Sequence, residues 1–277
     1  MILNYTINGK KHSVEAADGQ NFKYGKDTIL SNIFSDVTYH TKWYKEGHTS
    51  QKFLSESEFS DLYLGITQTI KSIAEGVVGK ELNGFTLENY HKFITTNEEH
   101  FKIVSKTRDL FSDDFGFPIK EMIPKFETLL GFELTDRIAG TNEDEHIIVR
   151  INRPKSNDYN PPHKDMYEGY DNGKNYNFLN FWVPIAGVTD KSSLPIAPKS
   201  HLIPEDNILR TIDGGKVGTN SYRVCLIKEW DGGSDLVRAK VSDGEVLMFS
   251  SHMIHGLAIN EEEDVTRVAL EFRLFKK

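Results

Sequence analysis

Cysteine is almost absent from this chain. Cys225 is the only one among 277 residues, so no disulfide can form within the chain, and a reducing, cytoplasmic location is expected. The first residues also lack the basic and then apolar pattern of a secretory signal. No stretch approaches the roughly 18 consecutive apolar residues of a membrane-spanning helix. A soluble protein without a membrane partner is therefore expected.

Positive charge is the second scarce feature. The chain has 33 Lys and Arg residues against 41 Asp and Glu residues, a formal net charge of -8. Such a chain lacks the basic surface that proteins use to bind a phosphate backbone, so nucleic acid is not an expected partner. With 38% hydrophobic residues and no internal repeat, the chain is long enough to bury one sizeable core. Residues 1–277 are therefore expected to form a single domain.

Helical patterns dominate residues 1–140, which are expected to form a hairpin and helical scaffold. An Asn-Gly turn signal after the alternating run Ile2 to Ile7 predicts an N-terminal hairpin. Ser55, followed three residues later by Glu58, is a capping box, and apolar residues then recur at helical spacing until Gly76. Further helices are expected over residues 87–94, over 98–111 with Asn97 as the cap, and over 122–130.

Runs of β-branched and aromatic residues take over after residue 141. Turn residues divide them into six predicted strands, over residues 146–152, 177–185, 222–228, 236–241, 245–255 and 266–275. This pattern predicts a mainly β fold with N-terminal helices, in which a double-stranded β-helix (a jelly-roll or cupin-like barrel) is flanked by α-helices. The polar segments 153–160, 171–175 and 203–220 are longer than ordinary hairpin loops and are expected to shape a binding mouth.

Three side chains form a candidate metal site. In an extended strand the side chains alternate between faces, so His163 and Asp165 project the same way and can bind one metal. A third ligand must come from elsewhere, and His255, at the end of a predicted strand, is a suitable candidate with His252 as its rival. Two histidines and one carboxylate on one face of a metal leave the opposite positions open, as in non-haem Fe(II) oxygenases.

From about His146 to Phe275 the chain resembles the 2-oxoglutarate and Fe(II)-dependent dioxygenases and, within them, the phytanoyl-CoA dioxygenase-like branch. The resemblance rests on marks that stand in the family's order: the His163 and Asp165 pair, the strand Asn180 to Ile185, the turn Pro198-Lys199-Ser200-His201, His255-Gly256 and Arg267. One mark departs from the family's pattern, because Lys199 stands where this turn usually has glycine.

The resemblance implies a catalytic domain with a defined metal and reaction. His163, Asp165 and His255 would be the catalytic residues that hold Fe(II), and His255 is preferred to His252 because the family's last ligand precedes a glycine, as Gly256 does here. The implied reaction uses O2 and 2-oxoglutarate, releases succinate and CO2, and oxidises a C–H bond of a small-molecule substrate.

The resemblance also implies a pocket for the cosubstrate. Arg267 would bind the far carboxylate of 2-oxoglutarate, since an arginine inside a barrel is costly to bury unless it meets an anion. Asn180 and Trp182 share one strand face, which is expected to look into this pocket. Arg273 is the alternative anchor, and otherwise it is expected to be a solvated arginine at the end of the barrel, paired with Glu271.

The substrate and the use of 2-oxoglutarate are the open points. Polar loops and tyrosines at positions 159, 167, 170 and 176 suit a small polar, carbohydrate-like or natural-product substrate better than a fatty acyl chain. Two alternatives stay open: a cupin-like metal enzyme that does not use 2-oxoglutarate, such as a sugar epimerase, and a non-catalytic barrel that only binds a ligand.

Overall fold

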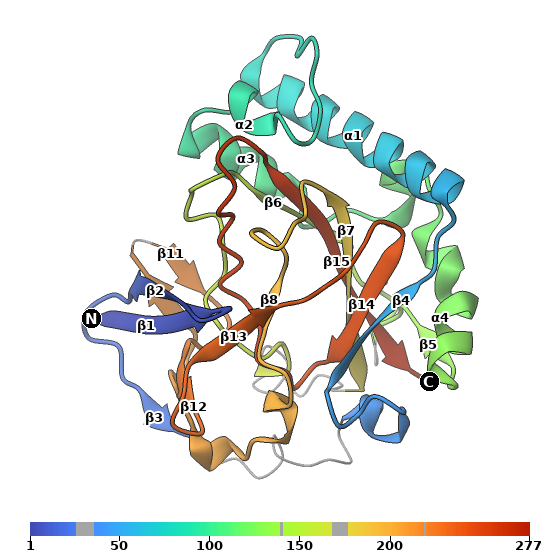
Figure 1. Ribbon diagram of the computed structural model, residues 1–277. Helices are drawn as coiled ribbons and strands as arrows, with labels where there is room; N and C mark the ends of the chain where they lie inside the picture. Colours follow the sequence, from blue (N-terminus) through green and yellow to red (C-terminus); the bar gives the residue numbers. More distant parts are fainter. Residues whose placement is uncertain (26–35, 139–140, 168–176, 219) are drawn as a thin grey trace.

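A large antiparallel sheet runs through the middle of the molecule. The computed structural model describes residues 1–25, 36–138, 141–167, 177–218 and 220–277 (Figure 1). The strand order of the large sheet is β4-β14-β7-β15-β5, and β6 also pairs with β15. The strands are β4 (His48–Lys52), β5 (Leu134–Thr135), β6 (Ile148–Asn152), β7 (Phe178–Ala186), β14 (Glu245–Ser250) and β15 (Arg267–Lys276).

Smaller sheets lie on the other side of the molecule from α4 (Figure 1). One has the order β2-β1-β13-β8, a second has the order β12-β9-β3, and β10 pairs with β11. Their strands are β1 (Ile2–Ile7), β2 (Lys10–Glu15), β3 (Lys23–Tyr24), β8 (Pro195–Ile196), β9 (Ile208–Arg210), β10 (Gly215–Val217), β11 (Asn220–Tyr222), β12 (Ile227–Trp230) and β13 (Asp235–Arg238). The fold is thus mainly β and jelly-roll-like, and the predicted N-terminal hairpin is confirmed.

Helices from the first half cover one face of the large sheet (Figure 1). They are α1 (Glu56–Val78), α2 (Tyr90–Phe93), α3 (Asn97–Lys106) and α4 (Ile123–Leu130). The 3-10 turns are η2 (Val37–His40), η3 (Ser112–Phe115) and η4 (Ile119–Met122) in the first half of the chain, and η5 (Ser200–Leu202) and η6 (Glu205–Asn207) in the second. None of the helices in the described ranges combines the length and the apolar character needed to cross a membrane.

The helix ends follow local chemistry. The capping box of Ser55 and Glu58 is present at the start of α1, but the helix continues past Gly76 and ends where Gly79 adopts a left-handed conformation. The predicted cap of α3 is wrong by one residue, because Thr96, and not Asn97, accepts the backbone hydrogen bond. The expected helix over 87–94 is also shorter, since only Tyr90–Phe93 is helical.

The strand β7 separates two buried clusters. Phe181, Val183 and Ile185 face the helices and pack with residues of α1 and α4. Trp182 faces the opposite way and packs in a smaller cluster with Ala269 of β15 and residues of β8 and β14. This alternation confirms the predicted division of the strand into a core face and an inward face.

Two predicted strands have the wrong bounds. The run 222–228 is two strands, β11 and β12, because the backbone N–H of Leu226 donates to the Thr211 side chain instead of a strand partner. The run 245–255 ends at Ser250, whose Oγ accepts the backbone N–H of His252 and whose carbonyl accepts that of Met253. The segment 203–220, expected to be a loop, contains η6, β9 and β10.

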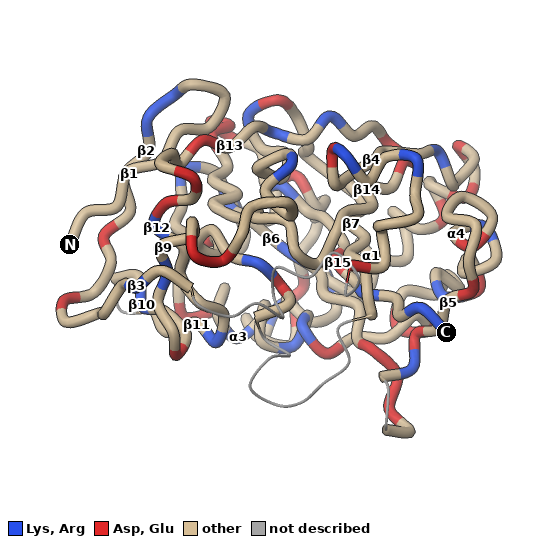
Figure 2. Tube along the Cα trace, turned by 90° about the horizontal axis from the view of Figure 1, so that it is seen from below, with Lys and Arg blue, Asp and Glu red and all other residues tan. Residues whose placement is uncertain are grey.

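Positively and negatively charged residues are mixed along the described chain. Figure 2 shows Lys and Arg interspersed with Asp and Glu along the trace.

Candidate metal centre

Two non-strand segments meet at the centre of the candidate site. The expected extended strand around His163 is wrong: residues 161–166 belong to no named strand. Instead His163 forms one isolated antiparallel bridge with His255, in which each backbone N–H donates to the other's carbonyl, at 2.9 Å and 3.0 Å. A turn begins at Asp165 and returns this side chain to the same place. The bridge fixes the distance between the two histidines. Alternation of side chains along a single strand could not have fixed this distance.

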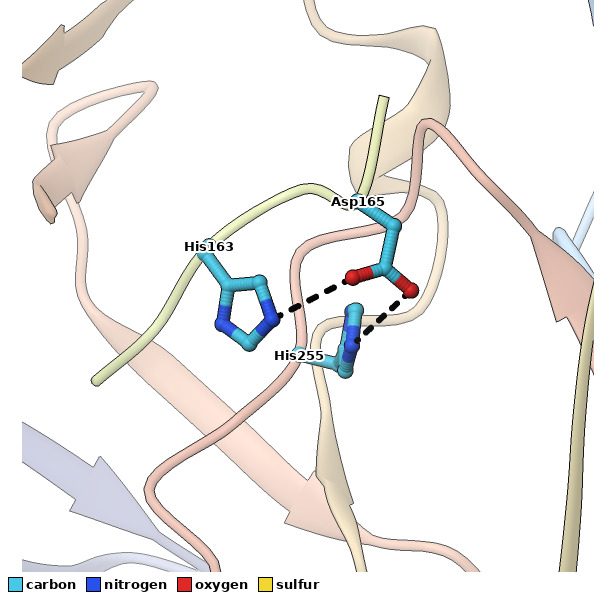
Figure 3. A group of neighbouring side chains, drawn as sticks. All are labelled: His163, Asp165 and His255. Atoms are coloured by element: carbon cyan, nitrogen blue, oxygen red, sulfur yellow. Dashed lines mark ion pairs between the residues drawn. The ribbon is translucent and has the colours of Figure 1, made fainter. Parts of the chain in front are cut away.

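The structure brings together the three predicted ligands (Figure 3). Nε2 of His163 lies 3.4 Å from Oδ1 of Asp165, and Nε2 of His255 lies 3.6 Å from Oδ2 of the same carboxylate. Their ligand atoms all lie within 4.8 Å of one another, and the side chains are 5%, 12% and 9% exposed. Within the described residues, no other group of three His, Cys, Asp or Glu side chains meets this spacing. His252 is buried nearby but lies outside the group.

Backbone carbonyls fix which ring nitrogen of each histidine faces the carboxylate. Nδ1 of His163 lies 2.7 Å from the carbonyl oxygen of Pro161, and Nδ1 of His255 lies 3.0 Å from that of Met253. A carbonyl oxygen can only accept, so each Nδ1 carries the hydrogen and each neutral ring keeps its lone pair on Nε2. Burial also lowers the pKa of His255, which favours the neutral ring that a metal requires.

Gly256 allows the two ligand segments to approach each other. Its φ is +125°, a backbone conformation that residues other than glycine rarely adopt. A Cβ at this position would lie 2.5 Å from the carbonyl oxygen of Pro161. That oxygen is the one that holds the tautomer of His163. Glycine is therefore favoured after His255, because a side chain there would collide with the carbonyl that orients His163.

Arg273 reaches the site from β15. Its Nη2 lies 3.2 Å from Oδ1 of Asp165, so the expected pairing of Arg273 with Glu271 is wrong. Glu271 pairs with Arg150 of β6 instead, at 2.6 Å, and Arg150 lies opposite Ala269, two residues from Glu271 on β15. Burial opposes ionisation of Asp165, but the guanidinium of Arg273 holds its pKa well below the usual range. The carboxylate is therefore held in the charged form that binds cations.

Arg267 lies inside the same face of the sheet without a described counterion in contact. It is 1% exposed, and its Nε and Nη1 atoms have no hydrogen-bond partner among the described residues. Burial lowers its pKa to about 10, and the nearest aromatic face is that of Trp182, at 5.8 Å from the guanidinium carbon. A buried guanidinium with unused donors is a costly arrangement unless an anion completes it.

Two further buried donors share this interior. Nε1 of Trp182 and Nδ2 of Asn180 have no hydrogen-bond partner among the described residues. Both belong to β7, whose register sets Trp182 beside Leu247 and Asn180 beside Phe249 of β14. The ring of Phe249 in turn packs on His255, at 4.9 Å between centroids. The interior between the metal candidates and Arg267 is thus lined by donors, and it fits an acceptor-rich anion such as a dicarboxylate.

Other expected site residues lie elsewhere. The hydroxyl of Tyr167 donates to Glu205 in a buried cluster, so this tyrosine does not face a ligand as expected. Tyr170, Tyr176 and the polar segment 171–175 lie outside the described residues. The contact between Arg273 and Asp165 was not predicted from the sequence. Its position gave an indication, because Arg273 lies an even number of residues from Arg267 on one strand and therefore shares its face.

Comparisons with known proteins yield only distant structural likeness. No protein-family model and no curated protein matches the chain. Among solved structures, the chain is similar to AviO1 from Streptomyces viridochromogenes, with a TM-score of 0.47, 12% identity, and coverage of 84% of this chain and 91% of that one. It is also similar to the epimerase SnoN in complex with Fe3+, alpha ketoglutarate and nogalamycin RO, with a TM-score of 0.45, 14% identity, and coverage of 90% and 84%.

A third similar structure is EvdO2 from Micromonospora carbonacea var. aurantiaca, complexed with 2-oxoglutarate. It has a TM-score of 0.44 and 14% identity, and the match covers 93% of this chain and 94% of that one. At these identities and scores the function of this chain has to be argued from its own site.

Proposed function

We propose that this protein is an Fe(II)- and 2-oxoglutarate-dependent oxygenase. One observation carries the metal: both His163 and His255 hold Nδ1 on a backbone carbonyl and turn Nε2 toward the carboxylate of Asp165. Imidazoles whose other nitrogen is fixed in this way are the usual arrangement of metal-binding histidines. Two histidines and one carboxylate favour iron with open positions for further ligands.

The interior donors support 2-oxoglutarate as the anion. We propose that Arg267 binds its far carboxylate, because its buried guanidinium has Nε and Nη1 without a partner among the described residues and matches a carboxylate in geometry and charge. The unpartnered donors of Trp182 and Asn180 would line the path between this carboxylate and the metal. Ala269 packs in the same cluster as Trp182, and its small side chain takes up little room beside the proposed cosubstrate.

The chain's own residues bind, orient and shield the reaction. When bound, iron and 2-oxoglutarate supply the oxidation, in which O2 and 2-oxoglutarate give succinate and CO2 while one oxygen atom enters a substrate C–H bond. Burial of His163, Asp165 and His255 limits water at the metal. Arg273 keeps Asp165 ionised, so that the carboxylate is ready for the cation.

The substrate is proposed to be a small polar molecule. The donors at the site and the polar segments beside it suit a carbohydrate-like or natural-product molecule rather than a long acyl chain. The order of the sequence marks also places the chain nearest the phytanoyl-CoA dioxygenase-like branch, on a double-stranded β-helix scaffold, and we propose this placement with the function.

An anaerobic titration tests the proposal. Addition of 2-oxoglutarate to protein loaded with one equivalent of Fe(II) should produce a visible charge-transfer band that saturates at one equivalent. Asp165→Ala and His255→Ala should abolish the band, whereas His252→Ala should keep it. A wild-type protein that binds Fe(II) but gives no band would indicate a metal enzyme that does not use 2-oxoglutarate. A protein that binds no Fe(II) would leave only a non-catalytic binding module.

A further inference from the structure

The residue between two of the proposed ligands is fully buried. Lys164 is 0% exposed, and its Nζ donates to Oε1 of Glu205, which is 1% exposed, at 2.9 Å. Nζ of Lys164 binds Glu205, whereas the side chains of His163 and Asp165 on either side of it point toward each other and toward His255 (Figure 3). A buried lysine is rare and is kept only where its charge is fully matched.

Glu205 is held by three side chains. Its second oxygen accepts the hydroxyl of Tyr167 at 2.8 Å and Nε of Arg210 at 3.2 Å. The guanidinium of Arg210 also lies over the ring of Tyr167, 4.3 Å from its centroid. Burial opposes ionisation of Glu205, but Lys164 and the other donors bring its pKa below the usual value. The cluster is therefore a hydrogen-bonded network in which Glu205 meets two cations.

The segment that carries Glu205 also contacts the residue before His255, the third proposed ligand. The backbone N–H of Ala197 donates to the carbonyl of Ile254 at 2.8 Å, and Oγ of Ser200 accepts the N–H of Ile254 at 2.8 Å. Ile254 directly precedes His255. One continuous segment, residues 197–205, therefore binds both Ile254, which precedes His255, and Lys164, which lies between His163 and Asp165. It meets Ile254 through its backbone and Ser200, and it meets Lys164 through a buried ion pair.

We infer that Lys164 and Glu205 are positioning residues that set the spacing of His163 and Asp165 for a divalent metal. The inference rests on the metal site of the proposed function and assigns a task to residues that touch neither metal nor substrate. Backbone hydrogen bonds hold this segment at Pro162, at His163 and at Met166, whose N–H donates to the carbonyl of Ser251 at 3.2 Å. The ion pair of Lys164 with Glu205 adds a side-chain constraint on the residue that separates the two ligands.

Co(II) binding by calorimetry tests the inference, with Lys164→Met as the variant. Groups that orient metal ligands typically change metal affinity by 10–100-fold when removed, so the dissociation constant should rise at least tenfold. Arg238→Met is the matched control. Arg238 is also a buried cation paired with a glutamate, Glu261 at 3.1 Å, but its side chain donates to the carbonyls of Ser193 and Ile259, which lie outside residues 161–167 and 251–256. Its Co(II) affinity should stay within threefold of wild type.

Two results would overturn the inference: unchanged Co(II) affinity in Lys164→Met, or an equal loss in Arg238→Met at a similar melting temperature. The double variant Lys164→Met/Glu205→Gln removes both charges while leaving an acceptor for Arg210. It should melt closer to wild type than Lys164→Met and still bind Co(II) at least tenfold more weakly. Recovery of full affinity in the double variant would also overturn the inference, because folding alone would then explain the loss.

Amide exchange of the metal-free protein separates this inference from the proposed function. The amides of His163 and His255 protect each other in the bridge, and they should exchange at least tenfold faster in Lys164→Met than in Arg238→Met. If wild type binds no Co(II) but the exchange changes as expected, the metal proposal fails and the positioning role stands. Equal exchange in the two variants would overturn the positioning role whatever the metal result.

Discussion

Arg267→Met should stabilise the protein without ligands and weaken the binding of 2-oxoglutarate. The guanidinium is 1% exposed, and two of its nitrogens have no partner among the described residues. Burial lowers its pKa from 12.5 to about 10, which corresponds to about 3 kcal/mol of destabilisation of the charged form. Replacement by an apolar side chain of similar length removes this cost, so the free energy of unfolding should rise by about 1 to 3 kcal/mol.

The effect on 2-oxoglutarate should have the opposite sign. A hydrogen bond to a charged group contributes about 1.5 to 3 kcal/mol, so loss of one bond corresponds to at least about tenfold in the dissociation constant. Loss of two bonds would correspond to about a hundredfold. The assays are urea unfolding of the metal-free protein and anaerobic calorimetric titration of 2-oxoglutarate into the Fe(II)-loaded protein.

Arg238→Met is the control for the sign of the stability change. Its Nη1 donates to the carbonyl of Ser193 at 2.7 Å and its Nη2 pairs with Glu261 at 3.1 Å, so its removal should destabilise by about 1 to 3 kcal/mol. The reasoning about Arg267 is refuted if Arg267→Met destabilises the metal-free protein as Arg238→Met does. It is also refuted if 2-oxoglutarate binds the Arg267→Met variant as tightly as wild type.

Three further outcomes are expected. Asp165→Ala should abolish succinate formation from 2-oxoglutarate, because the anionic ligand is lost, while His252→Ala should retain it in the same coupled assay; turnover by the first variant would contradict the ligand assignment. Gly256→Ala should weaken Fe(II) binding at least tenfold in calorimetry, since its Cβ would displace the carbonyl that fixes the first histidine, and wild-type affinity would be the opposing result. Burial, only partly offset by Asp158, holds the pKa of His100 at about 4 against an ordinary 6.5. The unfolded state therefore takes up the proton at higher pH than the folded state. The free energy of unfolding should fall by about 3 kcal/mol as the pH drops from about 6.5 to about 4. In urea unfolding, the His100→Gln variant should show a much smaller loss over the same pH range.

The elements with strong local signals could be predicted from the sequence. Ser55 and Glu58 predict the start of α1 because their side chains satisfy the first backbone donors of the helix. The inward direction of Trp182 follows from strand alternation and is found in the structure. The end of α1 was missed because Gly76 is tolerated inside a helix, whereas Gly79 supplies the left-handed cap.

The long-range contacts of the site could not be predicted in this way. His163 and Asp165 were expected to share a strand face, but the backbone bridge to His255, 92 residues away, sets their geometry. No local signal marks Lys164 as buried, because its partner Glu205 lies 41 residues further along the chain. Lys199 occupies the position where related turns have glycine, and it adopts a left-handed backbone with φ of 68°, a strain that local propensity does not predict.

Anomalous diffraction at the iron edge tests the central claim most directly, on crystals grown without oxygen in the presence of Fe(II) and 2-oxoglutarate. The account predicts a single iron peak bounded by Nε2 of His163, Nε2 of His255 and the carboxylate of Asp165, with the far carboxylate of 2-oxoglutarate on Arg267. Iron bound at another set of side chains, or a far carboxylate that rests on Arg273 instead of Arg267, would contradict it.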